Sequence, residues 1–286
     1  MNQPQEGLEL PDQLGTLLQA ARHRQQIPSA LYEFHTVHHQ LSQPTAFVFW
    51  GDWHLGAQGT DYELFERDLR ALAYAKSLLN DQLQVIGMGD YIDGYLPTGT
   101  PKNPVQMMSP REQRKAALQA LRLVKPLLVL EGDHDEWHTR QDVEYAWLYE
   151  GTKHLDINYA QWGAEIQITL DGRYQPLKLL ARHRFKGSRY TDVLKPHKNL
   201  HLEHGPAEIA VLAHVHSNPG VYKTHAKRKS EGTFLAVQSG TYKLVDDYAK
   251  KLGFIESDYG VPAIIVYPDG RLASFDRFQD SLDELV

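Results

Sequence analysis

The sequence contains no cysteine among its 286 residues. This absence excludes disulfides, thiolate nucleophiles, and zinc or iron–sulfur sites that depend on cysteine ligands. Any metal ion must therefore be held by histidine and carboxylate side chains. Histidine is abundant, with 15 copies, although abundance alone identifies no site.

Long apolar runs are also missing. No window approaches the roughly 18 consecutive apolar residues of a membrane span, and the polar start at residues 1–6 lacks the basic and apolar segments of a signal peptide. We therefore expect a cytoplasmic protein with no membrane partner. The glycine-rich loops of P-loop and dinucleotide-binding proteins are absent too, which disfavours NTP-driven work and NAD chemistry.

Basic residues are fewer than acidic ones, and the formal net charge is −6. This total does not favour a general electrostatic attraction to nucleic acid. The basic residues are nevertheless concentrated between positions 182 and 198. Such runs are usually solvated faces, but this one surrounds His183, so Arg182, Arg184 and Lys186 are candidate substrate-binding residues.

The composition, with 42% hydrophobic and 23% charged residues, is that of a globular protein. The length suits one large α/β domain with decorations. Residues 8–42 have a helical, amphipathic pattern interrupted at Pro28. We therefore predict an N-terminal helical extension over residues 1–42 and a single domain over residues 43–286.

Three short apolar runs in the first half each end in a Gly-Asp pair. They lie at 46–50, 85–88 and 127–130. Helical patterns at 61–80 and 110–124 alternate with them, which predicts βαβ units and a parallel sheet. Because functional residues gather at the carboxyl ends of such strands, we expect Asp52, Asp90 and Asp133 to lie close together.

The second half is rich in predicted strands. They cover 165–170, 176–181, 209–213, 234–237 and 264–267, and the first two are joined by a hairpin-type turn at Asp171-Gly172. Two packed mixed sheets with outer helices accommodate this order of elements.

Histidines and further carboxylates adjoin the strand ends. Asp52-x-His54, Gly89-Asp90-x-x-Asp93, Gly132-Asp133-His134-Asp135, a lone His183 and His214-x-His216 follow in order. A single Gly-Asp step is usually a turn or a helix cap, but the conjunction predicts a metal site. Mixed histidine and carboxylate ligands suit Mn, Fe and Zn better than Ca or Mg. Two cations roughly 3.5–4 Å apart supply what phosphate-ester hydrolysis needs.

These five blocks, over residues 52–216, resemble the calcineurin-like metallophosphoesterase family. The resemblance implies a four-layer αββα sandwich and two divalent metal ions, with Mn²⁺ first and Fe, Zn, Ni or Mg as alternatives. It implies that one ion is held by Asp52, His54, Asp90 and His216, and the other by Asp90, Asp133, His183 and His214. Asp90 would bridge the two ions.

The resemblance also implies catalytic residues. His134 would face the leaving-group oxygen as a general acid or an electrostatic stabiliser, without binding metal. Asp93 would orient it, since a carboxylate partner fixes the tautomer of an imidazole. The chain departs from the family pattern at Asp133, where the family usually has Asn, at Ala213, where it has Gly, and at Gly94, where the Ser/Thr protein phosphatases carry a phosphate-binding Arg.

The sequence thus predicts a two-metal-dependent phosphoesterase that uses a metal-activated water, with diesters of nucleotides, DNA or RNA as the expected substrates. One alternative is a phosphomonoesterase acting on a small metabolite or a protein. A second is a binding scaffold whose metal site is altered at Asp133.

Several other side chains have two interpretations. Trp53, Tyr91 and Trp137 adjoin the motifs and would either stack on a nucleobase or, as is commoner, pack in the core. His35, His38 and His39 are more simply explained as surface or packing residues of the predicted helix than as a metal site. His197, His201 and His204 would line the groove or face solvent.

Overall fold

The computed structural model describes residues 34–94, 105–141, 146–188, 192–226, 232–244 and 257–285. Within these ranges the chain forms two six-stranded sheets. Sheet A has the strand order β1-β6-β7-β8-β10-β9, and sheet B has the order β12-β11-β2-β3-β4-β5. Both sheets contain parallel and antiparallel pairs.

The strands of sheet A are β1 His35–Leu41, β6 Ala164–Leu170, β7 Leu177–Arg182, β8 Ile209–Leu212, β9 Gly220–His225 and β10 Thr233–Gln238. Those of sheet B are β2 Thr45–Trp50, β3 Leu83–Gly87, β4 Leu128–Leu130, β5 Asn158–Ala160, β11 Ala263–Val266 and β12 Leu272–Phe275. The helices are α2 Tyr62–Leu79, η2 Asn80–Gln82, α3 Pro110–Val124, α4 Asp133–Gln141, α5 Trp147–His154, α6 Lys195–Glu203 and α8 Phe278–Leu285.

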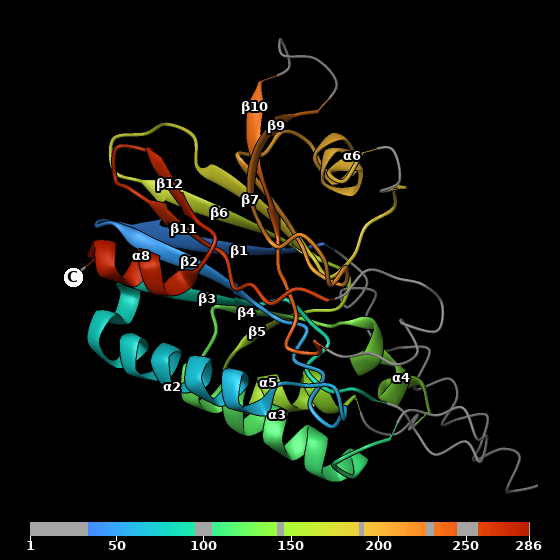
Figure 1. Ribbon diagram of the computed structural model, residues 1–286. Helices are drawn as coiled ribbons and strands as arrows, with labels where there is room; N and C mark the ends of the chain where they lie inside the picture. Colours follow the sequence, from blue (N-terminus) through green and yellow to red (C-terminus); the bar gives the residue numbers. More distant parts are fainter. Residues whose placement is uncertain are drawn as a thin grey trace, which may run out of the picture. The chain divides into compact units, whose positions relative to one another are not determined.

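Three apolar layers hold these elements together. One lies between sheet B and the helices α2, α3, α5 and α8, a second between the two sheets, and a third between sheet A and α6. Figure 1 shows α6 on the far side of the sheets from the other four helices. The predicted αββα sandwich, with two mixed sheets between helices, is therefore confirmed for the described residues.

Strand β2 shows why an unbroken apolar run is needed at the centre. Successive side chains of a strand point to opposite faces, so Phe47 and Phe49 pack against sheet A. Ala46, Val48 and Trp50 instead pack beneath the helices. All six residues of the strand are buried, as expected for a strand covered on both faces.

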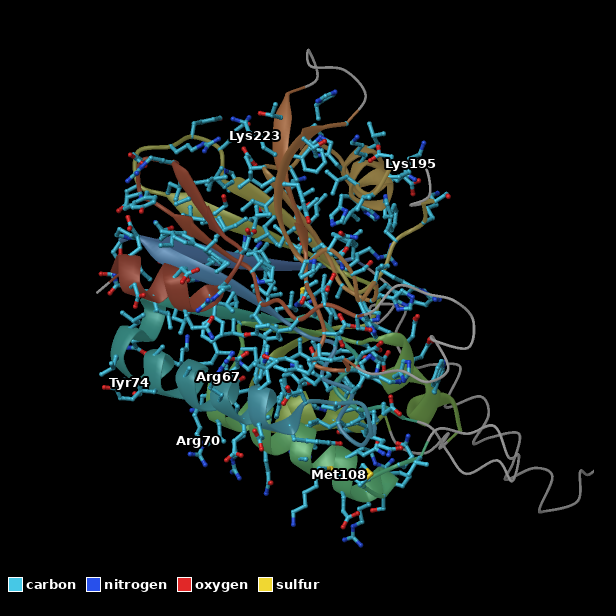
Figure 2. The ribbon with its side chains drawn as sticks, viewed as in Figure 1. Arg67, Arg70, Tyr74, Met108, Lys195 and Lys223 are labelled. Carbon is cyan, nitrogen blue, oxygen red and sulfur yellow. The ribbon has the colours of Figure 1, made fainter. Side chains whose placement is uncertain are left out.

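The two long helices expected from periodicity are also present. Ser109 begins α3 with a reciprocal capping box to Glu112, and Asp61 caps α2 through Leu64 N–H. These contacts satisfy N–H groups that the first turn of a helix leaves free. Figure 2 shows Arg70 and Tyr74 pointing away from the sheets, on the exposed face of α2.

The predicted helix over residues 8–42 is wrong where the structure describes it. Residues 35–41 form β1, which pairs in parallel with β6. Val37 and Leu41 are buried, whereas the residues between them are largely open, so tertiary pairing overrides the local helical pattern. Residues 1–33 of the predicted extension lie outside the described residues, and the division of the chain into two domains stays a prediction.

None of the helices in the described part of the chain is both long and apolar enough to cross a bilayer.

Candidate metal centre

The carboxylates predicted to meet come from neighbouring parallel strands of sheet B. Asp52 follows β2, Asp90 follows β3, and Asp133 follows β4 as the first residue of α4. Strands β2, β3 and β4 run parallel, so their carboxyl ends share one edge of the sheet. Asp52 and Asp90 are almost fully buried there.

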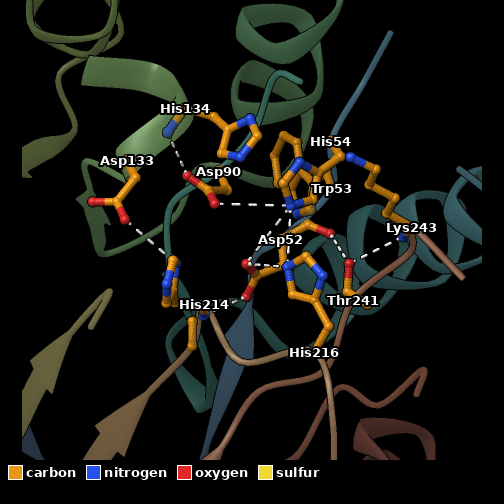
Figure 3. A network of polar contacts seen from close by, with 12 residues as sticks. Asp52, Trp53, His54, Asp90, Asp133, His134, His214, His216, Thr241 and Lys243 are labelled. Carbon is orange, nitrogen blue, oxygen red and sulfur yellow. Dashed lines mark hydrogen bonds and ion pairs between the residues drawn. The ribbon is translucent and has the colours of Figure 1, made fainter. Parts of the chain in front are cut away.

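The histidines of the second half come from the matching edge of sheet A. His183 follows β7, and His214 and His216 follow the parallel strand β8. His216 Nε2 lies 3.2 Å from Asp52 Oδ1, and His183 Nε2 lies 3.2 Å from Asp90 Oδ2. Packing of the two sheets thus joins residues that are more than ninety positions apart in the sequence, and Figure 3 shows His216 beside Asp52.

The first candidate metal group consists of Asp52, His54 and His216, whose ligand atoms all lie within 4.8 Å of one another. His54 Nε2 and His216 Nε2 are 3.2 Å apart. Burial, together with the neighbouring His134, lowers the pKa of His54 to about 4. A neutral imidazole has a nitrogen lone pair to offer a cation, so this group fits a divalent metal ion.

The second candidate group consists of Asp90, His183 and His214, within the same distance limit. His183 Nδ1 lies 2.8 Å from the Met88 carbonyl, while its buried Nε2 faces Asp90 Oδ2 at 3.2 Å. Burial opposes the charged form of His183, but Asp90 raises its pKa to about 10. The negative field that holds a proton at this imidazole suits a divalent cation equally well.

Asp90 lies between the two groups. Its Oδ1 accepts the His134 backbone N–H at 2.9 Å, and its Oδ2 lies 3.8 Å from His54 Nε2 as well as 3.2 Å from His183 Nε2. Burial opposes ionisation, yet His183 and His134 hold the pKa of Asp90 well below its usual range. One carboxylate oxygen therefore faces both groups, as a bridging ligand requires.

Asp133 lies at the edge of the second group. Its Oδ2 is 3.5 Å from His214 Nδ1 and only 2.7 Å from Arg184 Nη1. Among the described residues it completes none of the three-residue ligand groups. The structure thus brings Asp133 to the predicted site but pairs its extra charge with an arginine.

His134 lies beside both groups. Its ligand atom falls within 4.8 Å of those of His54 and Asp90. Its Nδ1 contacts the Asp93 backbone carbonyl, which assigns the Nδ1 proton and directs Nε2 elsewhere. Its ring meets His54 edge to face and lies against Trp137, with centroids 4.6 Å and 4.2 Å away.

The carboxylate of Asp93 has a different partner from the one predicted. It accepts from His54 Nδ1 at 3.2 Å and from Lys243 Nζ at 3.0 Å, whereas His134 Nδ1 is 4.0 Å from it. The nearer contact of His134 Nδ1 is instead the backbone carbonyl of Asp93. Burial opposes its ionisation, but His54 and Lys243 hold the pKa of Asp93 well below its ordinary value.

Lys243 is a site residue that sequence reasoning missed, as is Gln106, whose Nε2 donates to Asp93 Oδ2 at 2.7 Å. Lys243 is 4% exposed, and buried lysines are rare unless they are paired. Its backbone N–H donates to Thr241 Oγ1, which in turn donates to the Asp52 carbonyl (Figure 3). No motif surrounds Lys243 in the sequence, so only the tertiary structure connects it to Asp93.

Backbone strain marks the same residues. Asp52, His54, Asp90 and His214 have φ values of 49°, 48°, 52° and 65°, a region that costs non-glycine residues free energy and recurs at functional sites. Interlocked loops hold this conformation, since Asp52 N–H donates to the Gly89 carbonyl and His54 N–H to the Asp90 carbonyl. Gly132 is required here because a Cβ would lie 2.1 Å from Asp90 N.

The predicted basic residues surround a cavity of about 570 Å³ beside the second group. Arg182, Arg184 and Lys186 line it together with Asp133 and His183. Lys186 forms an ion pair with Glu203, as Arg184 does with Asp133. The structure therefore places the three cations next to the metal groups, with two of them already neutralised.

The other aromatic and histidine residues singled out in the sequence pack against neighbouring parts of the chain. Trp53 and Tyr91 are fully buried in the core beneath the helices, so neither presents a face to a nucleobase. His197 and His201 are buried against β10, at Val237 and Phe234, so the expectation that they line a groove or face solvent is wrong. His204 stacks on Phe34.

No protein-family model matches the sequence, and no curated protein matches it. Among solved structures, the fold is similar to that of the calcineurin-like phosphoesterase YfkN from Bacillus subtilis. The two have a TM-score of 0.42 and 10% sequence identity, over 82% of this chain and 89% of that chain.

Proposed function

We propose that this chain is a two-metal phosphoesterase that prefers phosphodiesters of nucleotides or nucleic acid. The proposal depends on the position of Asp90 Oδ2 between two histidines. This oxygen lies 3.2 Å from His183 Nε2 and 3.8 Å from His54 Nε2. Each of these histidines belongs to its own candidate metal group. Cations held there would neutralise the phosphoryl group, lower the pKa of water and stabilise the leaving oxygen.

The protein's own residues have distinct tasks in this proposal. Asp52, His54, Asp90 and His216 would hold one ion, and Asp90, His183, His214 and Asp133 would hold the other. His134 protonates or stabilises the leaving-group oxygen through Nε2, because its Nδ1 is engaged by the Asp93 carbonyl. Asp93 and Lys243 position His54, since the partner of the second ring nitrogen fixes the orientation of a ligating imidazole.

The preference for diesters rests on two features. Arg182, Arg184 and Lys186 line the cavity beside His183, and Gly94 follows Asp93 where the Ser/Thr protein phosphatases carry a phosphate-binding arginine. A cation next to the metal groups suits an anionic substrate.

The test compares substrates on the full chain. Protein stripped with EDTA and reloaded with Mn²⁺ is assayed on bis(p-nitrophenyl) phosphate, p-nitrophenyl phosphate, and single- and double-stranded DNA. We expect turnover of diesters that needs the metal. Turnover of monoesters alone would overturn the diester preference. Failure to bind Mn²⁺ in calorimetry, with no turnover of any ester, would favour a binding scaffold instead.

His134→Asn separates catalysis from metal binding. We expect it to retain both metal ions and lose roughly 100-fold or more in kcat, the usual contribution of a general acid. A variant that loses the metal would instead make His134 a ligand, since its ring lies within reach of His54 and Asp90.

A further inference from the structure

The cavity beside the second metal group has the size of a small-molecule site. Its volume of about 570 Å³ lies within the range of roughly 300–1,000 Å³ that ligand pockets occupy. Asp133 and His183 of the metal centre line it, and so do Trp162, Arg182 and Phe185. A phosphate ester bound at the metal groups would extend its organic substituent into this cavity.

The charges around the cavity are of both signs, so among the proposed phosphodiesters they favour a small ester over a polynucleotide. Its acidic residues are Glu131, Asp133, Glu136 and Glu203, and its basic residues are Arg182, Arg184 and Lys186. The lining thus carries four acids and three lysine or arginine side chains, a mixture of both signs. A long polyphosphate backbone would meet several of these carboxylates, whereas a small ligand with one anionic group needs a single cation.

Arg182 is the cation available for such a group. Arg184 is paired with Asp133 at 2.7 Å, and Lys186 is paired with Glu203. Within the described ranges, no carboxylate lies at ion-pair distance from Arg182, and its buried Nε makes no hydrogen bond. Burial lowers the pKa of Arg182, yet a guanidinium stays charged in proteins.

The side chain of Arg182 is held in place before any ligand arrives. Its guanidinium lies over the ring of Phe185, 5.0 Å from the centroid. Its stem passes over Gly163, where a Cβ would come within 2.6 Å of Arg182 Cγ. Because Nε is buried, a ligand in the cavity would meet the terminal Nη groups of Arg182, and a carboxylate or phosphate is the acceptor that suits an arginine.

We propose that this cavity binds the organic substituent of the substrate and that this substituent carries its own anionic group, which pairs with Arg182. Phe185 and Trp162, which is 42% exposed, add aromatic lining to the cavity, and such a lining suits an aromatic substituent. The inference rests on the proposed phosphoesterase function and narrows its substrates to small esters with a second negative charge.

The experiment uses two diesters that release p-nitrophenol and differ by one group, phenyl p-nitrophenyl phosphate and 4-carboxyphenyl p-nitrophenyl phosphate. We expect the carboxylate to lower KM about tenfold or more, as for a hydrogen bond to a charged group. Arg182→Gln should abolish this preference. Arg182→Lys, which keeps the charge but not the fork, should keep part of it and serves if the glutamine variant does not fold.

Arg271→Gln is the matched control because Arg271 also lies over an aromatic ring, 3.8 Å from the centroid of Tyr267, but does not line this cavity. It should keep the preference for the carboxylated ester. The inference is overturned if the wild-type protein does not distinguish the two esters, or if Arg182→Gln distinguishes them as well as the wild type.

Direct binding separates a failure of this inference from a failure of the proposed function. Calorimetry with 4-hydroxybenzoate and with phenol needs no turnover. If neither ester is hydrolysed but 4-hydroxybenzoate binds and Arg182→Gln weakens it, the cavity inference stands and the phosphoesterase proposal falls. If the esters are hydrolysed but 4-hydroxybenzoate binds no better than phenol, the phosphoesterase proposal stands and the cavity inference falls.

Discussion

The metal centre and the neighbouring cavity are built in opposite ways. Asp52, His54 and Asp90 are at most 1% exposed and are fixed by strained backbone and interlocked loops. Arg184 and Lys186 at the cavity have side chains that are 63% and 68% exposed. Burial makes each polar contact of the centre costly to lose, whereas solvent screens the pairs at the cavity. The effect of a substitution on metal binding and turnover should therefore decrease from the metal centre to the cavity.

Asp90→Asn tests the innermost position and should have the largest effect. Removing the charge that faces both candidate groups should lower metal occupancy and reduce diester turnover by about 10³-fold or more, if the ions supply several kcal/mol. Metal content by elemental analysis and kcat/KM with saturating Mn²⁺ would measure this. Asp156→Asn is the control, because Asp156 also has a positive φ, 57°, but is exposed. Equal effects of the two changes would contradict the comparison.

Asp93→Asn tests a residue that contacts the candidate metal ligand His54 but belongs to neither metal group. The neutral amide cannot both neutralise the Lys243 ammonium and accept the hydrogen bond from His54 Nδ1. We therefore expect His54 to lose its fixed orientation. We expect Mn²⁺ affinity to fall about 10- to 100-fold, measured by calorimetry. Lys243→Met should weaken binding in the same direction. If Asp93→Asn changed kcat alone and left metal affinity intact, the carboxylate would act on His134 instead.

The pH dependence of stability gives a second view of Asp93. Its folded pKa lies below the ordinary value of 3.8, so the stability it contributes is present above pH 4 and is lost as the pH falls further. Metal-free wild type should therefore exceed Asp93→Asn in free energy of unfolding at pH 6, and the gap should narrow below pH 4. Urea unfolding at a series of pH values would measure it, and a gap that stays constant would contradict the ionised carboxylate.

Arg184→Gln tests the outermost contact and should have the smallest effect. Removal of the cation leaves Asp133 freer to face a metal ion, so Mn²⁺ should bind more tightly, by no more than about fivefold because the pair is exposed. Titration of the second ion would detect it. A large loss of metal affinity would show that Arg184 holds Asp133 in place.

The sequence predicted the elements whose local signals agree with their tertiary environment. The apolar run of β2 and the capped, amphipathic helices α2 and α3 are buried as their patterns indicate. The pattern failed at residues 35–41, which have the spacing of a helix but pair with β6. A strand at the edge of a sheet carries few apolar residues, so its own sequence is a weak signal.

The residue types of the candidate centre were determined by the sequence alone, because Gly-Asp steps after parallel strands must meet at one edge of a sheet. Only the tertiary structure decided which groups touch. It turned Asp93 toward His54 and Lys243 and paired Asp133 with Arg184, and it left Arg182 without an ion pair among the described residues. Such contacts depend on electrostatic interactions and packing between residues that are far apart in the sequence. The spacing of residues within a motif does not reveal them.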